Sequence, residues 1–207
     1  RYTHDLDAWE PRRDEAYIGV LVDDLVTLGT QEPYRMFTSR AEYRLQLRED
    51  NADERLTSKG KGLGLITEPH WQAYKEKRQV IEQELVRLEA TFIHPETPAA
   101  ECLATKLKSP ITREYSMADL VRRPELSYRD VAGLKGDVVL DSATADHIET
   151  KVKYACYIAR QQDEIDRLKR HEATLIPPDF NFSEVSGLSN EICQKLTAIK
   201  PNNLARA

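Results

Sequence analysis

The sequence predicts a mainly α-helical fold, with helical subdomains, two long amphipathic helices and a short β element near the N-terminal end. The 207 residues include 31% charged residues and only 8 glycines, which is typical of helical, water-soluble domains. Two long stretches place apolar residues three and four positions apart, the spacing of one helix face. Only one short stretch alternates apolar and polar residues as a half-buried strand does.

The first helix is expected at about residues 15–28. Apolar residues recur there at helical spacing, between Asp14 as a candidate N-cap and Gly29 as a candidate residue just after the helix end. A strand over residues 18–22, an apolar run, is the alternative interpretation of the same segment.

A short strand is expected at residues 43–48, where apolar and polar residues alternate strictly. This pattern places Arg44 and Arg48 on the face opposite the apolar side chains. Because so short a strand is not stable alone, we expect it to belong to a sheet whose other strands lie partly outside the chain.

From residue 51 onward the pattern is helical. Each predicted helix follows a residue that can accept hydrogen bonds from free backbone N–H groups, or a proline boundary. Helices are expected from Asn51 to the glycines at 60–64, and over 68–91, 98–107, 116–123, 127–133, 143–172, 183–187 and 190–199. Their candidate caps include Thr67, Ser116, Ser127, Ser142, Ser183 and Ser189. Proline pairs and the helix pattern suggest three parts, residues 1–50, 51–175 and 176–207.

The two long helices carry the clearest apolar stripes. The stripe of 68–91 consists of Trp71, Tyr74, Ile81, Leu85, Leu88 and Phe92. The stripe of 143–172 consists of Ile148, Val152, Ala155, Ala159, Gln162, Ile165 and Leu168. We expect the first stripe to pack into the core, against the second helix.

Residues that carry chemistry are not arranged for catalysis. The three cysteines form no CxxC pair, and the five histidines lie at no metal-ligand spacing, so the sequence predicts no disulfide, zinc or other metal site. His147 and His171 fall on a charged helix and are expected to be solvated. Asp23 and Asp24 are neighbours on a helix and diverge by about 100°, so they do not share a site. The glycines of 60–64 lack phosphate-loop spacing and indicate a helix end and a turn.

Charge is distributed unevenly along the chain. The net charge is −5, yet residues 35–61 hold seven Lys or Arg against five acids. Arg35, Arg40, Arg44 and Arg48 are interleaved with Tyr34, Phe37 and Tyr43 in this segment. Arginine forks match phosphates and aromatic rings stack on unpaired bases, so an RNA-binding surface is one interpretation. Structural ion pairs with Glu32, Glu42, Glu49 and Asp50 are the other, and spacing alone leaves both open.

Near the C-terminal end, Leu188, Ile192 and Leu196 fall at i, i+4 and i+8, one stripe on a short helix. The subdomain that holds them is too small to bury all three. We therefore expect this stripe to bind a partner protein. No apolar run approaches the roughly 18 residues that span a bilayer, so no membrane partner is expected.

Several long segments resemble the MnmG/GidA family of tRNA-modifying enzymes. The resemblance is nearly gap-free over residues 15–25, 30–45 and 48–57, and continues in order at 120–125, 153–161 and 186–191. It covers essentially the whole chain and places it at the C-terminal region of the family. We therefore expect the chain to be a segment of a longer, cytoplasmic protein, with its last subdomain incomplete because family members continue beyond a Lys-Pro like Lys200-Pro201.

The resemblance implies the function of the longer protein. Family enzymes bind FAD in an N-terminal domain, reduce it with NADH, and take a one-carbon unit from methylene-tetrahydrofolate. With an MnmE-type GTPase they build aminomethyl or carboxymethylaminomethyl groups on C5 of the wobble uridine, and they are typically homodimers. The C-terminal region contacts the GTPase and helps to hold the tRNA. The flavin site, the NADH site and the catalytic cysteines lie upstream, so this chain is expected to hold no catalytic or cofactor-binding residue. The rival hypothesis is a helical adaptor that docks proteins without touching RNA.

Overall fold

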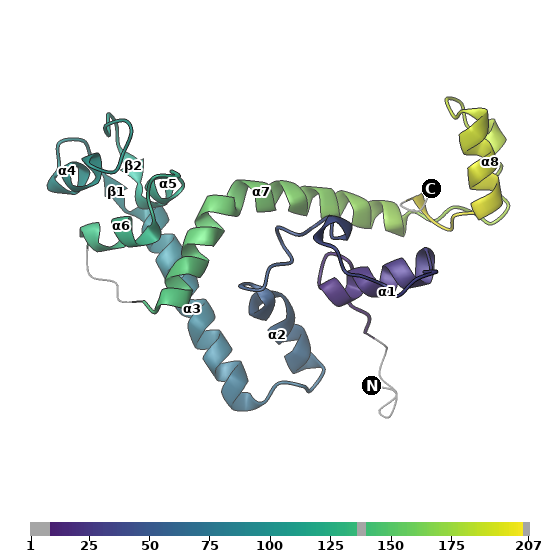
Figure 1. Ribbon diagram of the computed structural model, residues 1–207, viewed down its shortest axis with the longest axis horizontal. Coiled ribbons are helices and arrows are strands. Elements are labelled where there is room, and N and C mark those ends of the chain that lie inside the picture. Colours follow the sequence, from purple (N-terminus) through teal and green to yellow (C-terminus); the bar gives the residue numbers. More distant parts are fainter. Residues whose placement is uncertain (1–8, 136–139, 205–207) are drawn as a thin grey trace. The chain divides into compact units, whose positions relative to one another are not determined.

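The computed structural model describes residues 9–135 and 140–204, which form two compact units. The first unit ends at Ile158 and the second begins at Ala159, within one long helix. The mainly helical class is confirmed (Figure 1). The helices are α1 (Tyr17–Thr27), α2 (Ala52–Gly62), α3 (Glu68–Ala90), α4 (Pro98–Ala104), α5 (Met117–Val121), α6 (Tyr128–Ala132), α7 (Ser142–Ala173) and α8 (Asn190–Ile199). Short 3-10 turns are η2 (Thr38–Arg40), η3 (Gly133–Lys135) and η4 (Phe182–Glu184).

The main hydrophobic core of the first unit gathers around α3. Ile81 and Leu88 of α3 are fully buried, in one cluster with residues of α4, α5, α6 and the start of α7. The expected α3 stripe is therefore confirmed at its centre, although Leu85 is half-buried and Phe92 is exposed. α3 packs mainly against α5 and α2, and Ile148 of α7 joins the same cluster.

A buried carboxylate fixes α3 to α6. Glu84 accepts two hydrogen bonds from Arg87, each 2.7 Å, and one from the hydroxyl of Tyr128 at 2.8 Å. Burial, followed by the hydrogen bond to Glu84, raises the pKa of Tyr128 above its ordinary value. Because a buried charge is tolerated only when it is paired and hydrogen-bonded, this trio specifies how the two helices meet.

The β structure lies elsewhere than the sequence predicts. Strands β1 (Phe92–Ile93) and β2 (Tyr115–Ser116) pair antiparallel, whereas residues 43–48 form a turn. The amides of Gln46 and Leu47 donate to the carbonyl of Tyr43 at 2.9 and 3.0 Å. Positions i and i+4 lie on one side in both a strand and a helical turn, so Tyr43 and Leu47 are buried as the alternation implies. The expected strand is wrong because a local turn satisfies the same pattern.

The expected first helix is confirmed as α1, and the strand alternative is wrong. Gly29 has a φ of +65°, the left-handed conformation of a residue just after a helix end. Gly19 is buried on α1 beneath the preceding loop, where a Cβ atom would lie 2.3 Å from the carbonyl oxygen of Arg12. Glycine is therefore required for the close approach of this loop to the helix.

Serine caps are confirmed at three helices. The side chains of Ser116, Ser127 and Ser189 accept hydrogen bonds from backbone N–H groups in the first turns of α5, α6 and α8. Asn51 and Thr67 occupy the N-cap positions of α2 and α3, but neither side chain accepts a capping hydrogen bond.

Three other expected caps, at Asp14, Ser142 and Ser183, are wrong. The residues preceding those helices are instead Ala16, Asp141 and Asn181. Asp141 accepts from the Thr144 amide at 3.0 Å, and Asn181 accepts from the amide of Ser183 itself. Neighbouring polar residues can each serve as the N-cap, so the first residue of a helix is located from sequence only to within one or two positions.

His147 is buried, and the expectation of a solvated histidine is wrong. Only 3% of it is exposed, its Nδ1 lies 3.2 Å from Asp50, and its Nε2 lies 3.3 Å from Glu54. Lys151 donates to Glu54 at 2.6 Å. Hydrogen bonding from His147 is the main cause that lowers the pKa of Glu54 to about 2. The face of α7 that carries His147 looks polar in the sequence, but in the structure it packs against α2.

In the second unit, the residues just after α7 pair with the residues that follow α8. An isolated antiparallel bridge pairs Leu175 with Asn203, and Ile176 N donates to Asn202 O at 3.0 Å. Helix α8 ends at Ile199, and the next residue, Lys200, has a left-handed φ of 49° and is followed by a proline. This pairing brings together the two ends of the segment that contains α8.

Candidate nucleic-acid interface

Arg13 joins three segments of the first unit through its guanidinium. Its Nη1 donates to Asp24 at 2.7 Å and to Asp23 at 2.9 Å, both on α1. Its Nε and Nη2 donate to the two carboxylate oxygens of Glu42 at 2.7 and 2.9 Å, and Nη2 also donates to the carbonyl of Arg40 at 3.1 Å. A bidentate guanidinium–carboxylate pair fixes direction as well as distance. Arg13 therefore holds the segment around residues 40–42 against α1.

Asp24 is the buried centre of this arrangement. Besides Arg13, it accepts a hydrogen bond from the Tyr34 hydroxyl at 2.6 Å and one from Arg40 Nη1 at 3.4 Å. Burial by itself raises the pKa of Asp24, but the hydrogen bonds from Tyr34 and Arg13 outweigh it, so the pKa lies below its ordinary value. The carboxylate is therefore ionised at neutral pH and anchors the loop between α1 and η2.

This anchored loop forms an open, polar depression of about 350 Å³. Its lining residues all come from the loop itself, and they are Gly29, Thr30, Gln31, Glu32, Pro33, Tyr34, Arg35, Phe37 and Arg40. The guanidinium of Arg40 lies over the Tyr34 ring, 5.0 Å from its centroid. Phe37 is exposed at the rim of the same loop. Stacked cations and exposed rings are groups that nucleic acids contact.

The four arginines expected to bind RNA divide into two kinds. Arg35 and Arg44 are exposed, and neither forms an ion pair with any residue in 9–135 or 140–204. Arg40 is bound to Asp24, and Arg48 donates to both oxygens of Asp50 at 2.8 and 3.0 Å. Two of the four therefore hold the local structure, and two present free guanidiniums to solvent.

The aromatic residues expected beside these arginines also divide. Tyr34 and Phe37 lie on the loop, whereas Tyr43 is buried and packs inside the protein. The alternative of ion pairs with acids close in sequence is confirmed at one position, since Arg48 binds Asp50. Glu42 is instead bound by Arg13, which lies outside the arginine series.

Sequence reasoning missed Arg13 and Asp24 as the residues that organise the loop. One signal was present, since Asp24 lies on the same helical face as Tyr17 and Val20, which are covered. An acid within an apolar stripe is seldom buried unless a cation or hydrogen-bond donors meet it. The partner, Arg13, precedes the helix by a few residues and carries no signal of its own.

The stripe expected to bind a partner is divided by the fold of the second unit. Leu196 is buried, Leu188 is half-buried and Ile192 is exposed. Leu196 therefore belongs to the interior of this unit. Ile192 and Ile199 are the large apolar side chains of α8 that solvent reaches.

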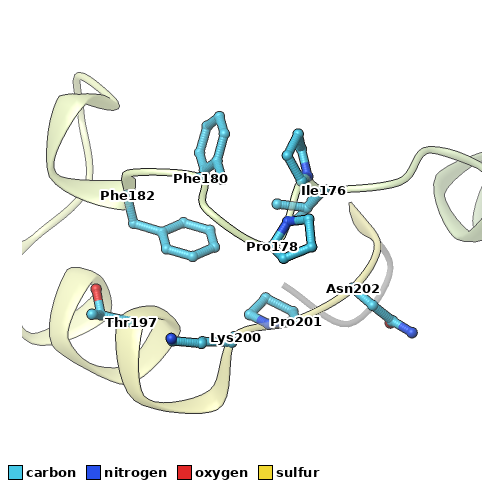
Figure 2. A pocket seen from close by; sticks show the side chains of 9 residues that line it. Ile176, Pro178, Phe180, Phe182, Thr197, Lys200, Pro201 and Asn202 are labelled. Carbon is cyan, nitrogen blue, oxygen red and sulfur yellow. The ribbon is translucent and has the colours of Figure 1, made fainter.

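An apolar groove of about 160 Å³ lies beside α8. Figure 2 shows that its walls come from two segments, one that leads into η4 and one that follows from the last turn of α8. The lining residues are Ile176, Pro177, Pro178, Phe180, Phe182, Thr197, Lys200, Pro201 and Asn202. The rings of Phe180 and Phe182 meet edge to face with centroids 5.2 Å apart, a favourable arrangement for an aromatic pair.

Within the described part of the chain, no three His, Cys, Asp or Glu residues are grouped to hold a metal ion. Cys102, Cys156 and Cys193 form no disulfide. None of the helices in residues 9–135 and 140–204 combines the length and the apolar character needed to cross a membrane.

Comparison with known proteins agrees with the helical fold. Residues 68–162 match the family described as tRNA modifying enzyme MnmG/GidA C-terminal helical domain, and residues 164–207 match its C-terminal helical bundle. The structure of Aquifex aeolicus GidA in one crystal form is similar with a TM-score of 0.68 and 36% identity, covering 94% of this chain and 30% of that one. A second crystal form gives a TM-score of 0.65 and 35% identity, covering 94% of this chain and 29% of that one.

The chain thus spans about 30% of the length of these similar structures. The two helical matches follow each other without overlap, and the structural likeness, at 94% of the chain, extends beyond the residues that they cover. This chain belongs to the MnmG/GidA family of tRNA-modifying enzymes, as its C-terminal helical region.

Proposed function

We propose that this chain is the tRNA- and GTPase-binding region of an FAD-dependent enzyme that installs aminomethyl or carboxymethylaminomethyl groups at C5 of the wobble uridine. The family membership supports an enzyme that modifies tRNA. In this proposal the whole protein is a cytoplasmic homodimer that uses FAD, NADH and methylene-tetrahydrofolate, and an MnmE-type GTPase is its partner. The residues of this chain supply binding rather than chemistry.

One observation carries the RNA part of the proposal. Arg35 and Arg44 are exposed, form no ion pair with residues 9–135 or 140–204, and lie on a segment that Arg13 and Asp24 hold in place. An arginine already fixed by its backbone loses less conformational entropy on binding a phosphate than one on a free chain. Arg40 and Arg48 lie on the same segment of the chain but already have carboxylate partners.

Replacement of Arg44 in the full-length enzyme tests the RNA role. Arg44→Ala should weaken tRNA binding and reduce the slope of log Kd against log salt by about 0.7, one released counterion. Arg44→Lys should restore affinity if only a point charge is needed, but not if the planar fork is used.

The matched comparison is Arg48→Ala, where the guanidinium is bound to Asp50 and to the carbonyl of Leu45. It should lower the melting temperature more than Arg44→Ala does. If Arg44→Ala leaves both affinity and salt slope unchanged, the RNA role of this segment is wrong.

The GTPase part of the proposal rests on the exposed apolar side chains of α8. Of the three residues in the expected stripe, Ile192 is the one available to a partner. Ile192→Asp should weaken binding of the GTPase, whereas Gln194→Asp, which adds the same charge at an exposed position of α8, should not. Equal effects of the two substitutions would place the docking surface elsewhere.

The rival function, a helical adaptor without RNA contact, is separated by the same variants. It requires that Ile192→Asp removes partner binding while Arg44→Ala has no effect on tRNA. Arg35 and Arg44, exposed and without an ion pair among the residues that the structure describes, favour the RNA-binding function over this one.

A further inference from the structure

Two arginines outside the loop described above share one tyrosine ring. The guanidinium carbon of Arg113 lies 5.0 Å from the Tyr115 ring centroid, and that of Arg123 lies 4.7 Å from it. The two guanidinium carbons are therefore at most 9.7 Å apart. Like charges this close repel each other unless an anion lies between or beside them.

No carboxylate in the described ranges neutralises either guanidinium. Of the charged residues next to them in sequence, Arg122 pairs with Asp119 at 2.6 Å and Glu114 lies 3.7 Å from His94. Arg113 and Arg123 form no ion pair with residues 9–135 or 140–204. The pair therefore presents two uncompensated positive charges in a small area.

Both the ring and Arg123 are held by the fold. Tyr115 pairs with Ile93 between β1 and β2, and it packs against the main hydrophobic cluster. The amide of Arg123 donates to Leu120 O at 3.1 Å, and its carbonyl accepts from the amide of Leu126 at 3.1 Å. β2 in turn packs against α5 (Figure 1), which ends at Val121, two residues before Arg123. A binding group on a fixed backbone is preorganised for its ligand.

The chemistry of these groups suits a phosphate. Guanidinium forks bind phosphate oxygens with two parallel hydrogen bonds, and a tyrosine hydroxyl can donate a third. The hydrogen bond from Arg113, together with the charges of both arginines, lowers the pKa of Tyr115 below its ordinary value. That direction is the one expected where the local potential is positive.

We propose that Arg113, Tyr115 and Arg123 form a binding site for a backbone phosphate of tRNA. The site lies in the helical domain matched at residues 68–162, on elements distinct from the α1–η2 loop. It rests on the proposed function in one respect, namely that the enzyme binds tRNA. It adds a second phosphate contact to the one proposed at the α1–η2 loop. The tRNA would then be bound by two separate parts of the first unit.

Tests of the site compare neighbouring arginines in the full-length enzyme. Arg113→Gln and Arg123→Gln should each weaken tRNA binding about tenfold, the effect of losing a charge-assisted hydrogen bond. Each should also reduce the salt slope by about 0.7 to 0.9. Arg122→Gln is the matched control, because Arg122 is adjacent but paired with Asp119. Its affinity and slope should stay close to those of the parent.

The ring is tested separately from the charges. Tyr115→Phe keeps the aromatic ring that both arginines face and should retain most of the affinity, whereas Tyr115→Leu removes it and should weaken binding. Melting temperatures of all variants report any loss of fold. Losses of affinity in Arg113→Gln and Arg123→Gln no greater than in Arg122→Gln would overturn the site.

Two further arms identify the ligand. A single-stranded RNA should compete with tRNA at this site, and inorganic phosphate at constant ionic strength should not compete at concentrations comparable to those of the RNA phosphates. Competition by free phosphate alone would assign the site to a small anion and overturn the RNA assignment. If Arg44→Ala weakens tRNA binding but the Arg113 and Arg123 variants do not, only this inference fails. If the unmodified full-length enzyme binds no tRNA, both this inference and the proposed function fail.

Discussion

Replacement of Asp24 by asparagine should destabilise the first unit far more than the same replacement at Asp23. Both carboxylates accept hydrogen bonds from Arg13, at 2.7 and 2.9 Å. The side chain of Asp24 is 7% exposed and also binds Tyr34 and Arg40, whereas the side chain of Asp23 is 39% exposed. The two variants remove the same charge from the same guanidinium and differ in burial.

The expected magnitudes follow from that difference. Asp24→Asn removes charge-assisted hydrogen bonds from a buried group, which costs about 2–3 kcal/mol of unfolding free energy, while Arg13 keeps its other partners. Asp23→Asn removes an exposed pair and should cost about 0–1 kcal/mol. For a unit of this size each kcal/mol corresponds to a melting-temperature change of about 2–4 °C. Thermal unfolding followed by circular dichroism should therefore show a fall of roughly 4–12 °C for Asp24→Asn and at most about 4 °C for Asp23→Asn.

The pH dependence provides a second check on Asp24. Its pKa is lowered in the folded protein, so the carboxylate stabilises the fold above its unfolded pKa of about 3.9. This stabilisation is lost as the pH falls through the folded value. The difference in melting temperature between the parent and Asp24→Asn should thus be full at pH 7 and shrink below about pH 4. Equal melting temperatures for the Asp23 and Asp24 variants, or a difference that is independent of pH, would refute the role assigned to the buried carboxylate.

Two further predictions concern the rest of the first unit. The pKa of Glu54 is lowered to about 2, so its contribution to stability should disappear between about pH 5 and pH 2, and Glu54→Gln should flatten the pH dependence of melting there more than Glu191→Gln does. Leu88 is fully buried and Leu85 only half-buried, so Leu88→Ala should cost about 2–5 kcal/mol of unfolding free energy and Leu85→Ala clearly less. Denaturant unfolding measures both leucine variants, and equal costs would mean that the burial of this stripe is not what stabilises α3.

The helices were predictable because their signals are local. The 3–4 spacing of apolar residues located α3 and α7 nearly to their ends, and serine caps located α5, α6 and α8. A cap or a stripe acts within one or two turns, so neighbouring residues are enough to read it. The strand expected over 43–48 was not predictable in the same way, because a strand forms only with a pairing partner. None of the described residues pairs with this segment.

The candidate site was only partly predictable, for a related reason. The sequence located the arginine-rich segment, but spacing did not decide which guanidiniums have carboxylate partners. Arg48 is bound two residues away by Asp50, whereas the partners of Arg13 lie up to 29 positions along the chain. Likewise Arg113 and Arg123, ten positions apart, meet on one ring only because β2 packs against α5.

The sequence by itself determined the helical class, the course of the helices and the family, since periodicity, capping and long runs of family residues are properties of short segments. The tertiary structure alone decided the environment of each charge. It buried His147, which looks solvated on its helix, paired the buried Asp24 with Arg13, and left Arg35 and Arg44 without partners among acids that are close in sequence. The physical reason is that an ion pair depends on distance and burial, and both are set by the packing of elements remote in the chain.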